Sequence, residues 1–412
     1  MHRQIAGKLT SPVTKWIVLA AWIVVFVVAS GFAQKLTDVQ NNEASSWLPS
    51  SAESTKALEK LKPFQDENDL PTVVVYHRDG GLTADDKAAI QSQVAEIQEM
   101  NGVQGQVVGP EFSDDGVAAQ TLVTFNFGKN GWNDLPDTAD KLRDIAAIDG
   151  VTVNIAGQGG QGADSAEVFA GVDGTLLFAA LGVVILILLF TYRSPVLWIL
   201  PIFSAMVALF TSEALIYLLA KYADLTVNGQ SQGILTVLVI GAGTDYALLL
   251  VARYREELRR HEDKHEAMAF ALRRAGPAIF ASGLTVCAAL LSLSLAKVNG
   301  TSGLGPIGAM GIAVAMVVML TFLPALLLIA GRRPFWPFIP RFGGVGADET
   351  HGFWRRVGDR VARRPVAVGT ATVLALVVMA LGLLNFSTGL TQGNSFRDSV
   401  ESIEGQDLIA LA

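Results

Sequence analysis

The sequence has 412 residues, of which 51% are hydrophobic and only 17% are charged. This composition, with a mean hydropathy of +0.40, argues against a purely soluble globular protein and predicts a membrane protein. A helix that crosses a bilayer needs about 20 mainly apolar residues. Seven stretches are long and apolar enough, namely residues 16–33, 175–191, 196–220, 230–252, 278–296, 304–330 and 366–386.

The charges are segregated along the chain. Residues 34–172 contain 22 Asp and Glu but only 9 Lys and Arg, whereas the whole chain has a net charge of -7. If the N-terminus is cytoplasmic, 19 Lys and Arg lie in inner segments and three lie in the short outer segments. This distribution follows the positive-inside rule. We therefore expect a multi-pass protein of the cytoplasmic (cell) membrane, with its acidic domain outside and its N-terminus inside.

The first apolar stretch has two interpretations. Lys15 precedes it and Gly31-Phe32-Ala33 offers a small-x-small cleavage site, which is typical of a secretory signal peptide. A second copy favours a permanent membrane helix instead: Ser11-Pro12-Val13 opens the first stretch and Arg364-Pro365-Val366 opens the seventh, each after basic residues. We therefore expect an internal repeat whose second copy has barely begun, as in transporters built from two halves.

The acidic segment has the pattern of an α+β domain. Strands are predicted at residues 71–77, 103–108, 119–127 and 151–156, with helices at 84–100 and 136–148. Two consecutive β-α-β units predict a ferredoxin-like, split β-α-β sandwich. A further helix at 52–61 should join this domain to the first membrane helix. Because the segment is acidic and does not interleave aromatic with basic residues, nucleic acid is not expected as a partner.

A glycine-rich run, residues 157–162, follows the last predicted strand. It superficially resembles a dinucleotide-binding fingerprint, but its glycine spacing is not G-x-G-x-x-G and a membrane helix comes next. We expect a flexible hinge between the outer domain and the membrane.

Asp245 is the strongest candidate for a functional residue. It lies about eight residues before Arg253, hence on the order of 12 Å inside the end of its helix. A carboxylate at this depth costs roughly 2.5–3.5 kcal/mol, so we expect Asp245 to face the bundle interior and to have a partner. Burial favours the neutral carboxylic acid, so that a buried Asp245 should be able to take up a proton from one side and release it to the other. We expect Tyr246 to form a hydrogen bond in this proton relay or to hold the partner of Asp245.

The residues before this pair fit close packing. Gly241 lies four residues before Asp245, and Gly243 lies three before Tyr246, so a side chain is missing one turn away from each. With Thr244, these glycines should leave room for another helix or for water. The alternative is a protonated Asp245 that serves only packing between helices.

Other polar residues in the apolar stretches carry weaker predictions. Glu213 could line an outer vestibule, although snorkelling or pairing near the interface explains it equally well. Cys287 is the single cysteine and is expected to act as a small packed hydrophobe. Four glycines, Gly303, Gly305, Gly308 and Gly311, should give one helix a thin face. Residues 253–274 should form an amphipathic helix along the cytoplasmic surface.

The run from Gly243 to Leu258, GTDYALLLVARYREEL, resembles the signature of the MMPL (mycobacterial membrane protein large) family of the RND transporter superfamily. The runs WLPS at 47–50, FTYRS at 190–194 and FLPAL at 322–326 are also similar to family segments. The order of one helix, an outer domain and five helices is shared. The resemblance covers essentially the whole chain.

This resemblance implies a proton-motive-force-driven exporter of lipids or other hydrophobic molecules, with outer porter domains. It implies that Asp245 and Tyr246 form the first of two Asp-Tyr pairs, whose second member lies on the tenth helix of a C-terminal half. We therefore expect either the N-terminal half of a longer protein or a truncated product. A second hypothesis, of another class, is a non-transporting membrane module that binds lipid or assists assembly.

The remaining expectations concern chemistry, partners and domains. A transporter driven by a proton gradient is not an enzyme, and we expect no catalytic residue, cofactor or metal. Expected partners are a hydrophobic substrate (a lipid or a drug), membrane lipids, the C-terminal half and a second copy of the chain. The predicted divisions are a cytoplasmic segment with the first helix (1–33), the porter-like domain (34–172), helices two to six (173–330), a basic linker (331–365), the seventh helix (366–386) and the start of a second outer domain (387–412).

Overall fold

The computed structural model describes residues 11–41, 68–128, 134–343, 353–385 and 399–411, together with a few scattered positions between 49 and 66. The predicted helix at 52–61 lies largely outside the described residues. The chain divides into two compact units. The first comprises Met1–Pro340 with Val400–Ala412, and the second comprises Arg341–Ser399.

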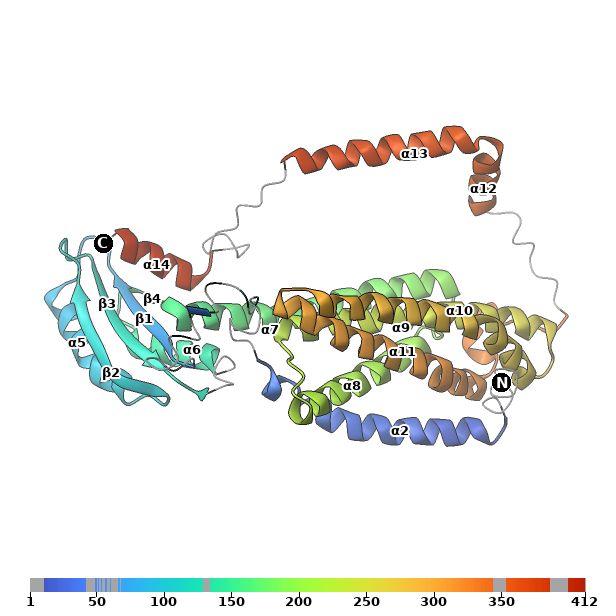
Figure 1. The fold of residues 1–412 in the computed structure, drawn as a ribbon, viewed down its shortest axis with the longest axis horizontal. Helices are drawn as coiled ribbons and strands as arrows, with labels where there is room; N and C mark the ends of the chain where they lie inside the picture. The colour runs from blue at the N-terminus through green and yellow to red at the C-terminus, as the bar shows by residue number, and fades with distance from the viewer. Residues whose placement is uncertain are drawn as a thin grey trace. The chain divides into compact units, whose positions relative to one another are not determined.

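The acidic segment folds as a four-stranded antiparallel sheet with two helices (Figure 1). The elements follow one another as β1 (Leu70–His77), α5 (Ala84–Gln98), β2 (Val103–Phe112), β3 (Ala118–Phe125), α6 (Leu135–Ala146) and β4 (Thr152–Ala156). The sheet order is β2-β3-β1-β4. Both β-α-β units are therefore split by an antiparallel strand, which confirms the predicted α+β topology.

Successive side chains of a strand point to opposite faces of the sheet, and apolar side chains of β1 are buried on both faces. Val74 and Tyr76 of β1 pack with Phe125 of β3 and with Ile90 of α5 in one core. Helix α5 begins in a reciprocal capping box, in which Thr83 Oγ1 accepts a hydrogen bond from the Asp86 backbone N–H. These local signals explain why the predicted strand and helix positions agree with the structure.

The opposite face of the sheet is covered by α14 (Glu401–Leu411). A methyl group at Gly405 would lie 3.0 Å from Asn154 Cβ and 3.5 Å from Val75 Cγ2, so this helix lies close against β1 and β4. Glu401 anchors the start of α14, because its carboxylate accepts a hydrogen bond from the Ile155 N–H at 2.9 Å and pairs with Arg143 at 2.5 Å.

The predicted hinge at residues 157–162 is wrong, because these residues form the first turns of α7 (Gly157–Tyr192). The glycines are needed for close approach. A methyl group at Gly159 would overlap the Thr72 side chain, and one at Gly160 would overlap the Ile155 carbonyl. The predicted domain boundary at residue 172 therefore lies inside a continuous helix, whose side chains are described up to residue 167 and again from 177.

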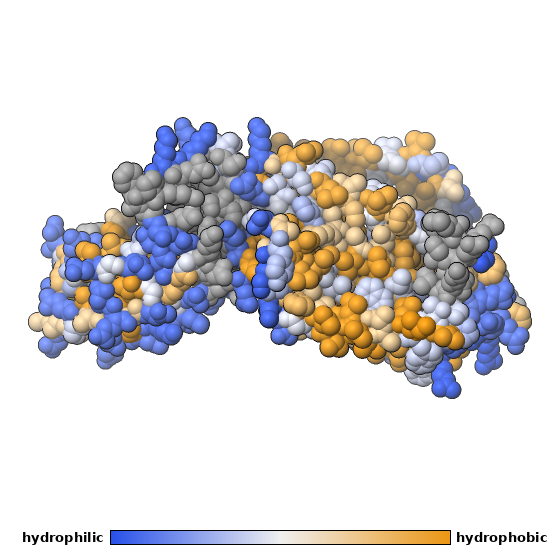
Figure 2. Space-filling view, turned by 60° about the horizontal axis from the view of Figure 1, so that its bottom comes forward, coloured by the Kyte–Doolittle hydropathy of each residue, from blue (hydrophilic) through white to orange (hydrophobic). Residues whose placement is uncertain are grey.

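Five further helices of the first unit make a bundle with the C-terminal part of α7: α2 (Thr14–Ala33), α8 (Ile199–Tyr222), α9 (Gly229–Arg260), α10 (Lys264–Ser292) and α11 (Asn299–Ala330). Short 3-10 turns follow several of them, at Thr37–Val39, Leu293–Leu295 and Arg333–Phe335. On the face drawn in Figure 2, hydrophobic residues gather over the helices and hydrophilic residues over the α/β domain.

Six helices of the described chain are long and apolar enough to cross a membrane: α2, α8, α9, α10 with its 3-10 extension, α11, and Pro365–Leu384. The second predicted stretch, 175–191, corresponds to the C-terminal part of α7, where the described apolar segment is the shorter Leu177–Tyr192. The fold is thus a helical membrane protein that carries a separate β-containing domain.

Helix α11 packs closely against its neighbours through glycines, as predicted from the spacing in the sequence. A methyl group at Gly305 would lie 2.6 Å from the Leu290 carbonyl oxygen, and one at Gly311 would overlap Leu235 of α9. Without a hydrophobic driving force in lipid, such close contact between backbones holds helices together by van der Waals packing.

The predicted amphipathic helix at residues 253–274 is wrong. Helix α9 continues to Arg260, the chain turns at 261–263, and α10 starts at Lys264. Asp263 caps α10, because its carboxylate accepts a hydrogen bond from the His265 N–H at 2.9 Å. The polar residues therefore belong to the ends of two membrane helices.

The second unit contains α12 (Phe353–Arg363), α13 (Pro365–Ala380) and a 3-10 turn at Leu381–Asn385. Helix α13 starts directly after the basic end of α12, with Pro365 at its first position, where a missing N–H is tolerated. It corresponds to the predicted seventh membrane helix.

Candidate functional site

Asp245 and Tyr246 lie in the middle of α9. Asp245 is 16 residues from the first residue of the helix, Gly229, and 15 from the last, Arg260. At 1.5 Å per residue it is about 24 Å from one end of α9 and about 22 Å from the other. The pair is therefore well inside the segment that is apolar enough to span a membrane.

The structure differs from the expectation that Asp245 faces the interior of this bundle. Its side chain is exposed, on a stripe of α9 that also includes Ile234, Val237, Gly241 and Leu249. The spacing of three to four residues places these positions on one face of the helix. The interior of the bundle is occupied by the opposite face, so no described helix of this bundle covers the Asp245 stripe.

Tyr246 points in the other direction, into the bundle, and is only 4% exposed. Its hydroxyl lies 3.3 Å from the position that a methyl group at Gly283 of α10 would take. The missing side chain at Gly283 thus leaves room for the tyrosine ring between α9 and α10. Sequence analysis did not single out Gly283.

The small residues around the pair have different surroundings. A methyl group at Gly243 would lie 3.0 Å from Met319 Cε and 3.7 Å from Ala205 Cβ, so Gly243 allows α9 to approach α11 and α8. Gly241 faces open space. The hydroxyl of Thr244 donates to the backbone carbonyls of Ile240 and Gly241 within its own helix. Gly241 therefore accompanies Asp245 on the open stripe, whereas Gly243 belongs to the packed interior.

Glu213 is not part of the same site. It is buried, with 9% exposure, on α8. Nine residues separate it from Tyr222 at the end of α8, so it lies about 14 Å from that end. Asp245 is about 24 Å from the adjoining start of α9, and the two carboxylates therefore lie at different depths. The predicted vestibule role of Glu213 stays a prediction.

Cys287 lies on α10, half-buried, with its Sγ 3.4 Å from the Ala309 carbonyl oxygen of α11. This contact fits a packed side chain. Among the described residues, no group of three or more His, Cys, Asp or Glu is arranged to hold a metal ion.

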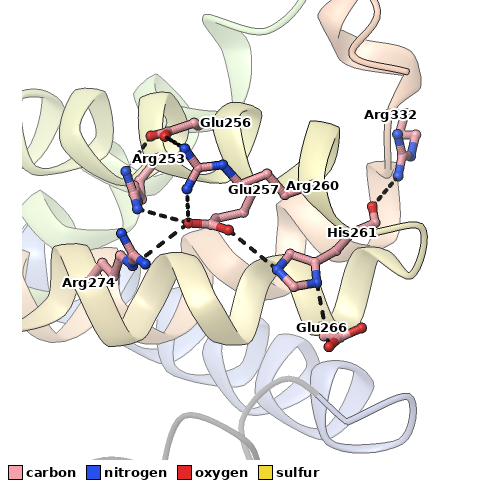
Figure 3. Close-up of polar contacts among 8 residues, drawn as sticks. All are labelled: Arg253, Glu256, Glu257, Arg260, His261, Glu266, Arg274 and Arg332. Atoms are coloured by element: carbon pink, nitrogen blue, oxygen red, sulfur yellow. Dashed lines mark hydrogen bonds and ion pairs between the residues drawn. The ribbon is translucent and has the colours of Figure 1, made fainter. Parts of the chain in front are cut away.

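A second cluster of polar residues, missed in the sequence, joins the adjacent ends of α9 and α10 (Figure 3). We call it the α9–α10 ionic cluster, and it comprises Arg253, Glu256, Glu257, Arg260, His261, Glu266 and Arg274. Glu257 is its centre, because its side chain is only 2% exposed.

Three cations and one histidine surround the Glu257 carboxylate (Figure 3). Arg253 Nη2 lies 2.9 Å from Oε1, and Arg260 Nη1 and Arg274 Nε lie 3.9 Å and 4.0 Å from the same oxygen. His261 Nε2 lies 3.4 Å from Oε2. Arg274 comes from α10, so Glu257 links the two helices. Asp263 followed three residues later by Glu266 is a capping-box pattern, which could have revealed the turn between them.

Comparison with known proteins identifies the family. The model of the MMPL family matches residues 46–368. The membrane protein ActII-3 of Streptomyces coelicolor is 50% identical over 399 residues, which cover 96% of this chain and 56% of that protein. The apo-petrobactin exporter of Bacillus anthracis is 31% identical over 448 aligned residues, which cover 100% of this chain and 60% of that protein.

A third relative, named "Probable transport protein MmpL10", comes from Mycobacterium leprae and is 30% identical over 406 residues, which cover 92% of this chain and 39% of that protein. The chain thus spans about half the length of three of the curated relatives it matches. The family match includes the helices α8 to α11 and the Asp245-Tyr246 pair. The chain is therefore a multi-pass membrane protein that belongs to the MMPL family.

Proposed function

We propose that the protein is part of a secondary active transporter that exports lipids or other hydrophobic molecules and is driven by the proton motive force. The observation that carries this proposal is the position of Asp245, a carboxylate in the middle of a membrane helix, on a stripe that no described helix of this bundle covers. An ionisable group at this depth costs free energy unless a partner compensates it, and such groups usually mark a functional site.

The open stripe of α9 fits a contact with a second half of the transporter. Gly241 provides a flat surface one turn from Asp245, and Val237 and Leu249 supply apolar contacts on either side. A matching Asp-Tyr pair on the facing helix would complete the relay. Binding of this helix would bury Asp245 and exclude lipid from it.

The proton gradient supplies enough free energy for the proposed cycle. One proton that moves down a potential of 100 mV releases about 2.3 kcal/mol. Coupling requires that Asp245 binds the proton in one conformation and releases it in another. Tyr246 is buried beside α10 and adjoins Asp245 in the same turn of α9. A movement of α9 when Asp245 binds or releases a proton would therefore also shift the contact between Tyr246 and α10.

We place the protein in the cytoplasmic membrane, with a cytoplasmic N-terminus and the α/β domain outside. The distribution of Lys and Arg supports this orientation. An impermeant thiol reagent tests it on a Cys287→Ser chain that carries Asn101→Cys, at an exposed position in the turn after α5. Labelling in intact cells is expected; labelling only after the membrane is broken would invert the orientation.

The names of two relatives support the transport proposal. One is named an exporter and another a transport protein. A transporter of this kind moves its substrate without changing a covalent bond, so we propose that the protein is not an enzyme. The apolar helix faces suit a hydrophobic substrate.

A vesicle assay tests the proton relay. The complete transporter, including a C-terminal half where the host encodes one, is reconstituted, and export of a fluorescent hydrophobic substrate is measured after a proton gradient is imposed. Asp245→Asn should abolish gradient-driven export while the protein stays folded. Asp224→Asn serves as the matched control, because it removes an exposed carboxylate from the loop between α8 and α9. Equal export by Asp245→Asn and the unmodified protein would refute the proposal.

A further inference from the structure

A cavity of about 530 Å³ opens at the end of the bundle where α9 meets α10 and α11 ends. Its lining residues come from two chain segments, the turn into α10 and the end of α11, and are Glu262, Asp263, Lys264, Ile329, Ala330, Gly331, Arg332 and Arg333. The cavity lies more than three turns of α9 away from Asp245 and shares no residue with the proposed relay.

The cavity is lined by three cationic residues, Lys264, Arg332 and Arg333, and by two acidic ones, Glu262 and Asp263. The Lys264 amine lies 3.7 Å from the position that a methyl group at Gly331 would take, so the amine lies beside the end of α11. Lys15 of α2 is buried and close enough for its charge to act on Lys264. Arg333 is exposed at the rim. Like charges held together in this way favour an anionic ligand.

The remaining polar groups of the cavity are already occupied in part. The Arg332 guanidinium donates to the carbonyls of His261 and Glu262 and thereby fixes the wall of the cavity, as Figure 3 shows for His261. The Asp263 carboxylate caps α10. No hydrogen bond or ion pair of the Lys264 amine is found within the described part of the chain, although the charge of Asp263 is close enough to act on it.

The cavity lies where the apolar part of the bundle ends. The apolar run of α11 stops at Ala330, and Ile329 and Ala330 line the cavity next to the arginines. Beyond it, Trp336, Phe338 and Ile339 are exposed. Aromatic side chains at this level are typical of the interface between hydrocarbon and headgroups. A ligand here would have its charged group beside Lys264 and its apolar part against the helices.

We propose that this cavity binds the headgroup phosphate of an anionic phospholipid from the membrane leaflet at this end of the bundle. The phosphate lies between Lys264 and Arg333, the buried charge of Lys15 adds to the positive potential, and the acyl chains extend along α11. Basic pockets between transmembrane helices bind anionic headgroups in this way. The proposal does not depend on the direction or the driving force of transport.

The test is a titration of the purified protein with phosphatidylglycerol, with bound lipid counted by native mass spectrometry. Lys264→Gln and Arg333→Gln should each weaken binding roughly fivefold, the effect of one cation near an anionic headgroup. Lys297→Gln is the matched control, because Lys297 is an exposed lysine beyond the other end of α10. Its affinity should equal that of the unmodified protein. Phosphatidylcholine should bind weakly to all four.

Two further measurements keep the result interpretable. Thermal unfolding in phosphatidylcholine should give the same midpoint for the unmodified protein and the variants, which shows that the substitutions do not unfold the bundle. If Lys264→Gln and Arg333→Gln bind phosphatidylglycerol as tightly as Lys297→Gln does, the cavity is not the site. Complete competition by inorganic phosphate would also overturn the proposal, because it would indicate a site for a free anion and not for a lipid.

Discussion

Asp245 and Tyr246 are consecutive residues of α9, yet Tyr246 is buried against α10 whereas Asp245 is exposed on the opposite stripe of the helix. Successive side chains of an α-helix are rotated by about 100°, so the two groups necessarily contact different neighbours. The tyrosine belongs to the packing of this chain. The aspartate is available to a surface outside the described helices of this bundle.

Substitutions at Gly241 and Gly243 distinguish the exposed stripe of α9 from its packed face. Gly243→Val should destabilise the bundle by about 1–3 kcal/mol, because a side chain there meets Met319 and Ala205. Gly241→Ala should be neutral or stabilising by up to about 1 kcal/mol, because it faces open space within a helix. Thermal unfolding in detergent measures both. Equal destabilisation by the two substitutions would contradict this assignment of faces.

Gly241→Leu tests the contact with a second half. It should leave the unfolding midpoint of this chain unchanged and reduce proton-driven export, since a large side chain would separate α9 from the facing helix. A variant at the start of the stripe, Ile234→Leu, conserves volume and is the control. If Gly241→Leu exports normally, the stripe around Asp245 is not a helix contact.

The α9–α10 ionic cluster predicts a large difference between adjacent glutamates. Glu257→Gln removes the buried carboxylate and leaves Arg253 and Arg274 without their shared partner, so it should cost about 3–5 kcal/mol. Glu256→Gln removes a partly exposed carboxylate and should cost at most about 1 kcal/mol. Chemical unfolding monitored by circular dichroism gives both values. A similar small cost for both would mean that Glu257 is solvated.

The capping box of α5 predicts a pH dependence in the α/β domain. The Thr83 backbone N–H donates to Asp86 Oδ2 at 2.7 Å, and this bond, with that of the Thr83 hydroxyl and the nearby Arg78, lowers the pKa of Asp86. Because the folded-state pKa lies below the unfolded value of about 3.9, the stabilisation is present above that value and is lost as the pH falls.

Hydrogen exchange of the α5 amides measures this effect in the intact chain. Protection should decrease as the pH falls below about 4, beyond the intrinsic change in exchange rate, and Asp86→Asn should remove that part of the pH dependence. Thr83→Ala should weaken α5 by about 1 kcal/mol through the lost N-cap. Unchanged protection in both variants would show that the capping box does not stabilise the helix.

Periodicity predicted the elements that local signals specify. The four strands of the sheet and helices α5 and α6 lie within a few residues of the predicted positions, because alternation and helix caps act over short distances. The membrane segments were recognisable for a similar reason, since hydrophobic length is a local property. The close approach of α11 to its neighbours followed from the spacing of its glycines.

Tertiary contacts explain what the sequence did not reveal. The glycine content of residues 157–162 favours a hinge. In the structure, positions 159 and 160 require glycine because Thr72 and Ile155 leave no room for a side chain. Burial of Glu257 depends on Arg274 from another helix. The orientation of Asp245 depends on which face of α9 the other helices occupy, and no periodic pattern distinguishes a face that meets this bundle from one that meets a different half.

Infrared difference spectroscopy tests the central claim most directly, namely that the carboxyl group of Asp245 binds and releases a proton. The membrane-reconstituted protein is recorded over a range of pH, with Asp245→Asn as the reference. We predict a carboxylic acid C=O band that is present at low pH, disappears as the pH rises and is absent from Asp245→Asn. A band assigned to Asp245 that is the same at every pH would contradict the proton relay.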